Sequence, residues 1–266
     1  MKILLFGKYG QLGWDLHRSL QGLGQVLAYD YPEIDFTVPS SLRRLVEDTR
    51  PQIVINAVAY TEVDKAESEA ERAKLIKAVA PAILAEICQG LGAAFIHYST
   101  DYVFDGQKGT PYTEEDAPHP LNVYGQTKLE GERAVLQLGG NNLIFRTAWV
   151  YSMRRDSFIS KVLSWAHSQH EMRIVEDQVS NPTWARALAE ITAQLLAKAG
   201  PDLLLWLSER RGLYNLAGGG FTSRLEWAKA ILQNDPDQTH QVVQRVLPAR
   251  SVEFPTAAAR PFFFGA

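Results

Sequence analysis

The chain has 266 residues, of which 46% are hydrophobic, and a formal net charge of −3, which is length enough for one large domain or one domain with an added lobe. This slightly acidic balance gives no electrostatic reason to expect nucleic acid or an anionic membrane as a partner. Cys88 is the one cysteine, so no disulfide can form within the chain. The sequence shows neither a basic and apolar leader nor an apolar run of about 20 residues. We therefore expect a cytoplasmic protein with no membrane span.

The chain opens on a short apolar run, residues 2–6, followed by Gly7-Lys-Tyr-Gly-Gln-Leu-Gly13 and a helical pattern of leucines. A continuous apolar run predicts a parallel strand that is buried on both faces. A strand, a glycine turn and a helix form a phosphate site for a dinucleotide, because glycines let the backbone approach the pyrophosphate and the helix N-terminus favours its charge. The spacing is Gly-x-x-Gly-x-x-Gly, not the commoner Gly-x-Gly-x-x-Gly, so the position directly after a strand is what favours this interpretation.

Residues 25–30 are expected to form the second strand, which ends in Asp30. An acid at this position commonly binds the adenosine ribose hydroxyls and disfavours a 2′-phosphate, which favours NAD over NADP. Lys8 in the glycine loop argues the other way because it could reach a phosphate, and Asp30 could equally be a polar strand end. A loop with Asp35 and Phe36 and a helix over residues 39–49 are expected next.

Two further strands are predicted, over residues 51–56 and 93–98, with a long helix over about residues 69–89 between them. Small residues follow the first of these strands, in the segment 57–61, and would let a flat cofactor lie against the backbone. The second strand leads to Ser99, Thr100 and Asp101. Ligands of an open α/β sheet bind outside the carboxyl ends of its strands, so we expect these segments and the glycine loop to converge at one edge.

A helix that carries Tyr124 and Lys128 is expected to begin near Asn122, whose side chain suits an N-cap. Residues at i and i+4 share one face of a helix. A free phenol has a pKa of about 10, and an adjacent ammonium favours the phenolate, so the pair can act as a proton donor and its activator. Thr100 or Ser99 would hold the substrate oxygen. The same spacing also occurs by chance on solvated helix faces.

The remaining chain predicts a fifth strand, residues 142–147, followed by Trp149, whose indole could either pack or stack on a sugar. Helices near 156–168, 184–199 and 222–233 and a short strand at 172–175 are expected after it. We expect a dinucleotide-binding domain over residues 1–150 and a substrate lobe over residues 151–266, interleaved with it. The predicted fold class is therefore α/β, a Rossmann-type doubly wound parallel sheet with a smaller C-terminal lobe.

Six segments in this order resemble the dTDP-4-dehydrorhamnose reductases, of the extended short-chain dehydrogenase/reductase superfamily. They are residues 7–13, Asn56-Ala-Val-Ala-Tyr-Thr-Glu-Val-Asp-Lys-Ala-Glu-Ser68, Ser99-Thr-Asp-Tyr-Val-Phe-Asp-Gly106, Pro120-Leu-Asn-Val-Tyr-Gly-Gln-Thr-Lys128, Phe145-Arg-Thr-Ala-Trp-Val-Tyr151 and Asp177-Gln-Val-Ser-Asn-Pro-Thr183. The resemblance covers about residues 1–260. It implies reduction of the C4 keto group of dTDP-4-dehydro-L-rhamnose by NADPH, with NADH also possible, to give dTDP-L-rhamnose.

The resemblance also implies roles for single residues. Tyr124 would donate the proton, Lys128 would bind the nicotinamide ribose and lower the pKa of the phenol, and Thr100 would hydrogen-bond the reacting oxygen. The substrate sugar would contact Asp101, Phe104 and Trp149. The cofactor would contact Gly7, Gly10, Gln11, Leu12, Asp30, Asp35, Phe36, Ala57, Ala59, Thr61, Tyr124 and Lys128.

Other features bear on metal, assembly and the C-terminus. Some relatives bind Mg²⁺ at a dimer interface through acids; Asp15 keeps one acid here but Arg186 stands where a second is expected, so no metal is predicted. Many relatives carry an asparagine where this chain has Lys77. We expect a monomer or homodimer. Family members continue further past the motif matched by Arg260-Pro261, so we expect a shortened C-terminus. Its three consecutive phenylalanines either pack against the protein or indicate that the natural C-terminus is altered or missing.

Two other functions stay open at this point. A nucleotide-sugar epimerase or dehydratase would share the fold and the tyrosine–lysine pair, but it would hold and recycle NAD⁺. A non-catalytic, nucleotide-binding regulatory subunit would bind the cofactor without turnover. The presence of Thr100, Tyr124 and Lys128 together favours the reductase.

Overall fold

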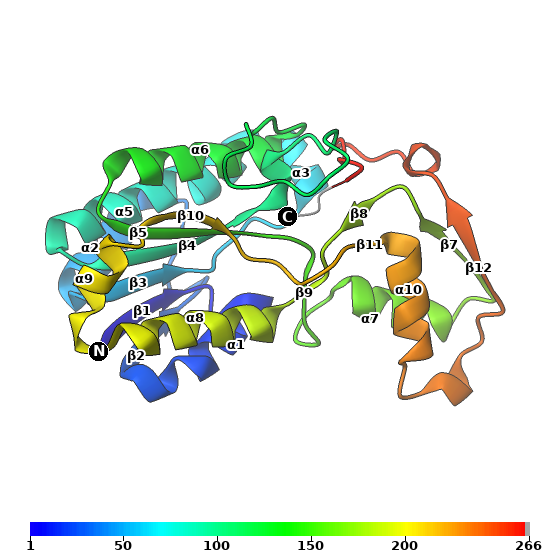
Figure 1. Ribbon diagram of the computed structural model, residues 1–266, viewed down its shortest axis with the longest axis horizontal. Helices are drawn as coiled ribbons and strands as arrows, with labels where there is room; N and C mark the ends of the chain where they lie inside the picture. The colour runs from blue at the N-terminus through cyan, green and yellow to red at the C-terminus, as the bar shows by residue number, and fades with distance from the viewer. Residues whose placement is uncertain (264–266) are drawn as a thin grey trace.

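The computed structural model describes residues 1–263 and contains a six-stranded sheet in the order β10-β5-β4-β3-β1-β2 (Figure 1). Within the described chain every neighbouring pair of this sheet is parallel. The strand order changes direction between β1 and β3, which is where an open α/β sheet binds its ligand. The expected fold class, a Rossmann-type parallel sheet with a smaller C-terminal lobe, is confirmed.

The central strands are β1 (Lys2–Phe6), β2 (Gln25–Tyr29), β3 (Ile53–Asn56), β4 (Ala94–Thr100), β5 (Asn141–Thr147) and β10 (Gly212–Asn215). The helices around them are α1 (Gln11–Ser19), α2 (Pro39–Thr49), α3 (Val63–Ser68), α4 (Ala70–Lys74), α5 (Ala80–Leu91), α6 (Val123–Leu138), α8 (Ala185–Ala199) and α9 (Leu203–Ser208). A π-helical turn, η2 (Leu75–Val79), joins α4 to α5. The lobe contains β6 (Val150–Tyr151), α7 (Phe158–Ala166), β7 (Glu171–Val175), β8 (Val179–Ser180), β9 (Thr183–Trp184), β11 (Thr222–Ser223), α10 (Arg224–Gln233) and β12 (Arg245–Ala249).

The central strands are buried on both faces, as their continuous apolar runs require. One face packs against α1, α8 and α9, and the other against α2, α5 and α6 (Figure 1). The long helix expected over residues 69–89 is instead interrupted, with α4, the π-helical turn and α5 in succession. The strands β10 and β12 and the helix α9 were not expected from the sequence.

The lobe is a smaller layer at the carboxyl end of the sheet, where β7 pairs in parallel with β12 and the helices α7 and α10 cover them (Figure 1). The expected boundary at residue 150 does not divide the chain cleanly. Residues 185–215 leave the lobe, and their helices α8 and α9 and strand β10 join the central sheet. The two parts are interleaved because β10, which follows the first segments of the lobe in the chain, pairs with the free edge of β5 in the central sheet.

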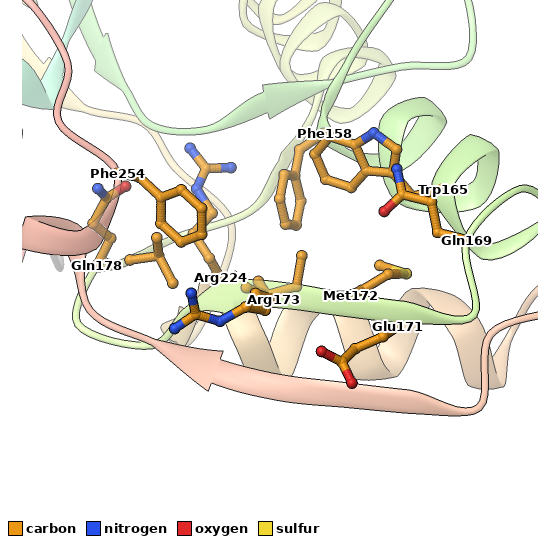
Figure 2. A pocket seen from close by; sticks show the side chains of 11 residues that line it. Phe158, Trp165, Gln169, Glu171, Met172, Arg173, Gln178, Arg224 and Phe254 are labelled. Atoms are coloured by element: carbon orange, nitrogen blue, oxygen red, sulfur yellow. The ribbon is translucent and has the colours of Figure 1, made fainter.

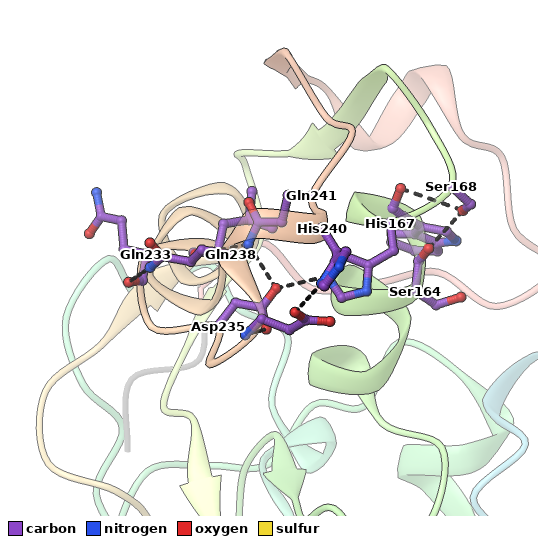
Figure 3. Close-up of polar contacts among 11 residues, drawn as sticks. Ser164, His167, Ser168, Gln233, Asp235, Gln238, His240 and Gln241 are labelled. Atoms are coloured by element: carbon purple, nitrogen blue, oxygen red, sulfur yellow. Dashed lines mark hydrogen bonds and ion pairs between the residues drawn. The ribbon is translucent and has the colours of Figure 1, made fainter.

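Polar contacts fix the far end of the lobe, around Asp235 at the end of α10 (Figure 3). Its Oδ2 lies 3.0 Å from His167 Nε2 and accepts a hydrogen bond of 2.8 Å from Gln241 Nε2. These contacts join α7, α10 and the segment that leads to β12, and they lie at the end of the lobe distant from the central sheet (Figure 3).

The end of the described chain crosses back to the central domain. Arg260 forms an ion pair of 2.7 Å with Asp64 at the start of α3. Phe262 accepts a backbone hydrogen bond from Val179 at 2.8 Å, and the ring of Phe263 meets that of Phe221 edge-on. Phe262 itself is 56% exposed, so the phenylalanines divide between packing and exposure. The third phenylalanine, Phe264, lies outside the described residues.

The packing of α1 on the glycine loop gives a test of the fold. A Cβ at Gly13 would lie 1.8 Å from the carbonyl oxygen of Gly7, whereas a Cβ at Gly22 would meet nothing within 4 Å. We expect Gly13→Ala to lower the free energy of unfolding by about 1–3 kcal/mol, because the helix must move away from the loop. Gly22→Ala is the matched control and should change it little. Equal urea midpoints for the two variants would contradict this packing.

Candidate active site

The carboxyl ends of β1, β3 and β4 meet at one edge of the sheet, as the sequence predicts. Their register aligns Phe6 with Asn56 and Asn56 with His97, so the segments that follow these strands lie next to each other. The backbone N–H of Ala57 donates to the carbonyl of Phe6 at 3.0 Å, which holds the start of the segment 57–61 against the glycine loop. Ala59 and Thr61, in that segment, are exposed at this edge.

The helix α1 presents its N-terminus at the same edge. Its N-cap is Gly10, and no side chain of the described residues caps it, so the N–H groups of Gln11 and Leu12 face the site without a side-chain acceptor. Four such N–H groups at a helix start, with the helix dipole, form an anion site. The Gln11 side chain meets the carbonyl of Val150 at 3.5 Å and the hydroxyl of Ser152 at 3.2 Å, which ties this end of α1 to the entry of the lobe.

The two residues expected to select the coenzyme, Asp30 and Lys8, are each engaged by neighbouring groups of the protein. The Asp30 carboxylate accepts hydrogen bonds from the backbone N–H groups of Tyr9 at 2.9 Å and Tyr31 at 2.8 Å. Lys8 forms an ion pair of 2.6 Å with Glu33, so its ammonium is already partly neutralised. Neither side chain is therefore a free determinant of coenzyme choice.

The two further positions in this region differ in exposure. Asp35 lies in a turn, where its carboxylate accepts from the N–H and the hydroxyl of Thr37 and has a lowered pKa for that reason. Phe36 is only 5% exposed and meets the ring of Phe6 edge-on at 5.3 Å. The Phe36 side chain therefore belongs to the core, and only its backbone can take part in binding.

The expected catalytic side chains lie together where β4 ends and α6 begins. Asn122 caps α6 by accepting a hydrogen bond of 2.8 Å from the N–H of Gly125, which sets Tyr124 in the first turn. The Thr100 side chain is near enough to the Tyr124 hydroxyl to lower its pKa. Thr100 donates to Asp101 Oδ1 at 3.0 Å. The hydroxyls of Tyr124 and Thr100, which the sequence singles out, thus lie in the same part of the structure.

Two glycines of α6 allow this helix to press on its neighbours. A Cβ at Gly125 would lie 2.1 Å from the carbonyl oxygen of Tyr102, and one at Gly131 would lie 2.2 Å from that of Lys77. The close approach removes water from the side chains between α6 and the sheet. Thr100 is 5% exposed, Asp101 3% and Lys128 2%.

Burial sets the charge states, and here one expectation was wrong. Lys128 was expected to lower the pKa of Tyr124. Instead, burial and the charge of Asp101 raise the pKa of Tyr124 above its ordinary value, and the Thr100 side chain opposes this only in part. The Lys128 ammonium donates to the carbonyl of Tyr98 at 2.7 Å. Burial lowers the pKa of Lys128 to about 8, although the Glu132 carboxylate opposes this. At neutral pH the phenol is therefore protonated, as a proton donor must be.

Sequence reasoning missed two side chains of the lobe that reach this cluster. Ser180 donates to Asp101 Oδ2 at 3.0 Å and so joins β8 to the end of β4. Arg224, the first residue of α10, is near enough for its charge to lower the pKa of Asp101, and burial lowers its own pKa to about 10. Ser180 lies in the segment 177–183 that carries the resemblance, but no role was assigned to it, and Arg224 lies outside every such segment.

The structure separates the two aromatic residues expected to contact the sugar. Trp149 stacks on Trp227 with centroids 5.5 Å apart, and the Arg224 guanidinium lies 3.6 Å from its ring centroid. Trp149 thus lies at the entry of the lobe beside a charged group. Phe104 is 1% exposed and stacks on Tyr112 at 4.2 Å, so it supports the loop and has no surface to offer a sugar.

A pocket of roughly 690 Å³ opens in the lobe beside Arg224. Phe158, Trp165 and Phe254 stand over the strand β7 around it, and Arg173 projects from that strand (Figure 2). A pocket of this size with aromatic walls and two guanidinium groups suits a flat ring joined to an anion.

Within residues 1–263 no group of three or more His, Cys, Asp or Glu side chains is placed to hold a metal ion. The same residues contain no helix with the length and apolar character that crossing a membrane requires.

The parallel sheet, the uncapped helix after a glycine loop and the set of Thr100, Tyr124 and Lys128 define the class of the extended short-chain dehydrogenase/reductases. Comparison with known proteins narrows this class. The chain belongs to the family described as the RmlD substrate binding domain, which matches residues 1–263.

Individual relatives agree with the family. A dTDP-4-dehydrorhamnose reductase of Burkholderia thailandensis is 43% identical over 264 residues, which are 98% of this chain and 88% of that protein. The crystal structure of a dTDP-4-dehydrorhamnose reductase from Clostridium acetobutylicum matches with a TM-score of 0.90 and 33% identity, over 100% of this chain and 89% of that one. That of Bacillus anthracis, in complex with NADP, matches with a TM-score of 0.88 and 31% identity, over 99% of this chain and 89% of that one.

The buried Asp101 gives a test of the site's electrostatics. Burial raises the pKa of Asp101 to about 6, against the hydrogen bonds from Ser180 and Thr100 and the charge of Arg224. The folded state therefore binds more protons than the unfolded state between pH 4 and 6, so Asp101 lowers stability as pH rises through that window. We expect the stability of Asp101→Asn, relative to the unsubstituted protein, to rise there by up to about 3 kcal/mol.

Asp116→Asn is the control with the opposite sign, because Lys108 and Thr113 hold the pKa of Asp116 below its ordinary value. Denaturant unfolding at a series of pH values measures both differences. A pH-independent difference for Asp101→Asn would contradict the buried carboxyl.

Proposed function

We propose that this chain reduces the C4 carbonyl of dTDP-4-dehydro-L-rhamnose to the alcohol of dTDP-L-rhamnose, with NADPH as reductant and NADH as a second coenzyme. The observation that carries the proposal is the set of Thr100, Tyr124 and Lys128 beside an uncapped helix N-terminus, with Thr100 and Lys128 buried and Tyr124 partly buried. We assign the substrate from the family match and from the relatives, which are named dTDP-4-dehydrorhamnose reductases.

The residues at the sheet edge fit a dinucleotide. The N–H groups at the start of α1 would hold the pyrophosphate, with Gly7, Gly10, Gln11 and Leu12 around it. Asp30, Asp35 and the backbone of Phe36 would face the adenosine end, and Ala57, Ala59 and Thr61 the middle of the molecule. When bound, the reduced nicotinamide supplies the hydride that C4 accepts.

Tyr124 would supply the proton that the developing alkoxide at C4 takes. The O–H bond of Tyr124 breaks as the bond from its proton to the C4 oxygen forms, and the electron pair stays on the phenolate. Thr100 is near enough to the same hydroxyl to lower its pKa, so its side chain can hold the C4 oxygen next to the acid. Lys128 would bind the nicotinamide ribose and keep a positive charge near the phenolate.

The lobe would hold the rest of the substrate. Asp101 and Trp149 would bind the sugar, since both are near Arg224. The pocket over β7 would take the thymidine diphosphate, with the base against Phe158 and Trp165 and the diphosphate near Arg224. Binding there fixes the distance of the C4 carbonyl from Tyr124.

Removal of the phenolic hydroxyl tests the proton donor. We expect Tyr124→Phe to lower kcat by roughly 10²–10⁴-fold, because general acid catalysis contributes that much, while cofactor affinity stays nearly unchanged. Its ring still packs edge-on against Tyr102, so the fold is preserved. Cofactor oxidation with dTDP-4-dehydro-L-rhamnose measures kcat, and fluorescence titration measures NADPH affinity.

Tyr98→Phe is the matched control, since it removes a hydroxyl bonded to Thr192 in the core and leaves the Tyr98 carbonyl in place. It should lower stability slightly and keep kcat. Full turnover in Tyr124→Phe would remove Tyr124 from the mechanism.

A further inference from the structure

Lys77 is a buried lysine without a hydrogen-bonding partner. It is 0% exposed, and its Nζ finds no acceptor among the described residues. An unpaired ammonium taken out of water costs free energy, and buried lysines are normally paired. Its presence in the core therefore requires an explanation other than stability.

The position of Lys77 is defined by two unusual features of the backbone. It lies in the π-helical turn η2, a rare geometry that is frequently found at functional sites. The carbonyl of Lys77 also touches α6 at Gly131, where any Cβ would lie 2.2 Å from its oxygen. Lys77 is therefore packed directly against α6, the helix that carries Tyr124 and Lys128.

The Lys77 ammonium faces the ring of the proposed acid. Its Nζ lies 4.0 Å from the centroid of the Tyr124 ring and 5.7 Å from that of Tyr60. A cation over a phenol attracts the ring's electrons. When the phenol loses its proton, part of the negative charge spreads into the ring, and the cation is then attracted by this added charge as well as by the ring's electrons.

We propose, building on the reduction described above, that Lys77 is a second cation of the active site, a positioning residue that stabilises the phenolate of Tyr124 from the face of its ring. No bond to Lys77 forms or breaks. As the proton passes from Tyr124 to the C4 oxygen, the electron pair left on the phenolate lies between Lys77 on the ring face and the hydroxyl of Thr100 at the oxygen.

The surroundings of Lys77 make its charge depend on pH near neutrality. Burial, and secondarily the charge of Lys128, lower the pKa of Lys77 to about 7, while the Glu67 carboxylate on α3 opposes this. The other titratable groups on the elements packed around it include the phenols of Tyr60 and Tyr124, the exposed Glu71, Arg72 and Lys74 on α4, and the exposed Glu86 on α5. Those on α3 and α6 include Asp64, Lys65, Glu130, Arg133 and Glu132, which pairs with Arg146. The cationic form of Lys77 is therefore present below pH 7 and lost above it.

Lys77→Met tests the proposal, because methionine is unbranched and apolar and suits a buried site. Below pH 7 we expect kcat to fall roughly 10- to 100-fold with little change in KM, since a desolvated cation–π contact of this kind is lost. Above pH 8 the loss should shrink, because the unsubstituted protein has then lost the same charge. Lys74→Met, an exposed neighbour, is the matched control and should keep both kcat and its pH profile.

Two further readouts separate this role from a merely structural one. The urea midpoint of Lys77→Met should lie above that of the unsubstituted protein at pH 6.5, and the gap should narrow as pH rises, because an unpaired buried charge has been removed. The double variant Lys77→Met/Tyr124→Phe should be no slower than Tyr124→Phe alone, since Lys77 acts through Tyr124.

The outcomes separate a failure of the proposed reduction from a failure of the proposed role of Lys77. If the unsubstituted protein does not oxidise NADPH with the sugar, the proposed reduction fails. If it does so and Tyr124→Phe is inactive, but Lys77→Met keeps its kcat at pH 6.5, the role of Lys77 is overturned. A further loss in the double variant would also overturn it.

Discussion

The close packing of α6 against the sheet controls the chemistry around Tyr124. At Gly125 and Gly131 the helix lies directly against the backbone of Tyr102, just past the end of β4, and of Lys77 in η2. Burial disfavours every charged form, so it raises the pKa of acids and lowers that of amines. Tyr124 and Asp101 have raised pKa values and Lys77 and Lys128 have lowered ones, all with burial as the largest cause. One packing constraint thus supplies a protonated acid and two amines that titrate near neutrality.

The same cluster joins the two layers of the molecule. Asp101 accepts from Thr100 of the sheet and from Ser180 of the lobe, so the carboxyl forms a bridge across the site. Gln11 adds a second connection, from the start of α1 to the entry of the lobe. The proposed cofactor and substrate sites are therefore joined by side chains of the proposed active site.

The parts of this account that could be predicted from sequence are those that depend on local pattern. The strand before Gly7, the helix cap at Asn122 and the shared helix face of Tyr124 and Lys128 each need only neighbouring residues. The return of β10 to the sheet and the approach of Arg224 to Asp101 depend on residues far apart in the chain. The pKa of Tyr124 was mispredicted for a similar reason, because an i, i+4 pair shows which side chains share a face but not how much water they lose.

The most direct test of the central claim follows the hydride. NADPH that carries deuterium at the transferable position would be incubated with dTDP-4-dehydro-L-rhamnose, and the product would be examined by nuclear magnetic resonance. The account predicts dTDP-L-rhamnose with deuterium at C4, in an amount equal to the cofactor oxidised. A product without deuterium, or one formed while the cofactor returns to its starting state, would contradict it and indicate an epimerase or dehydratase.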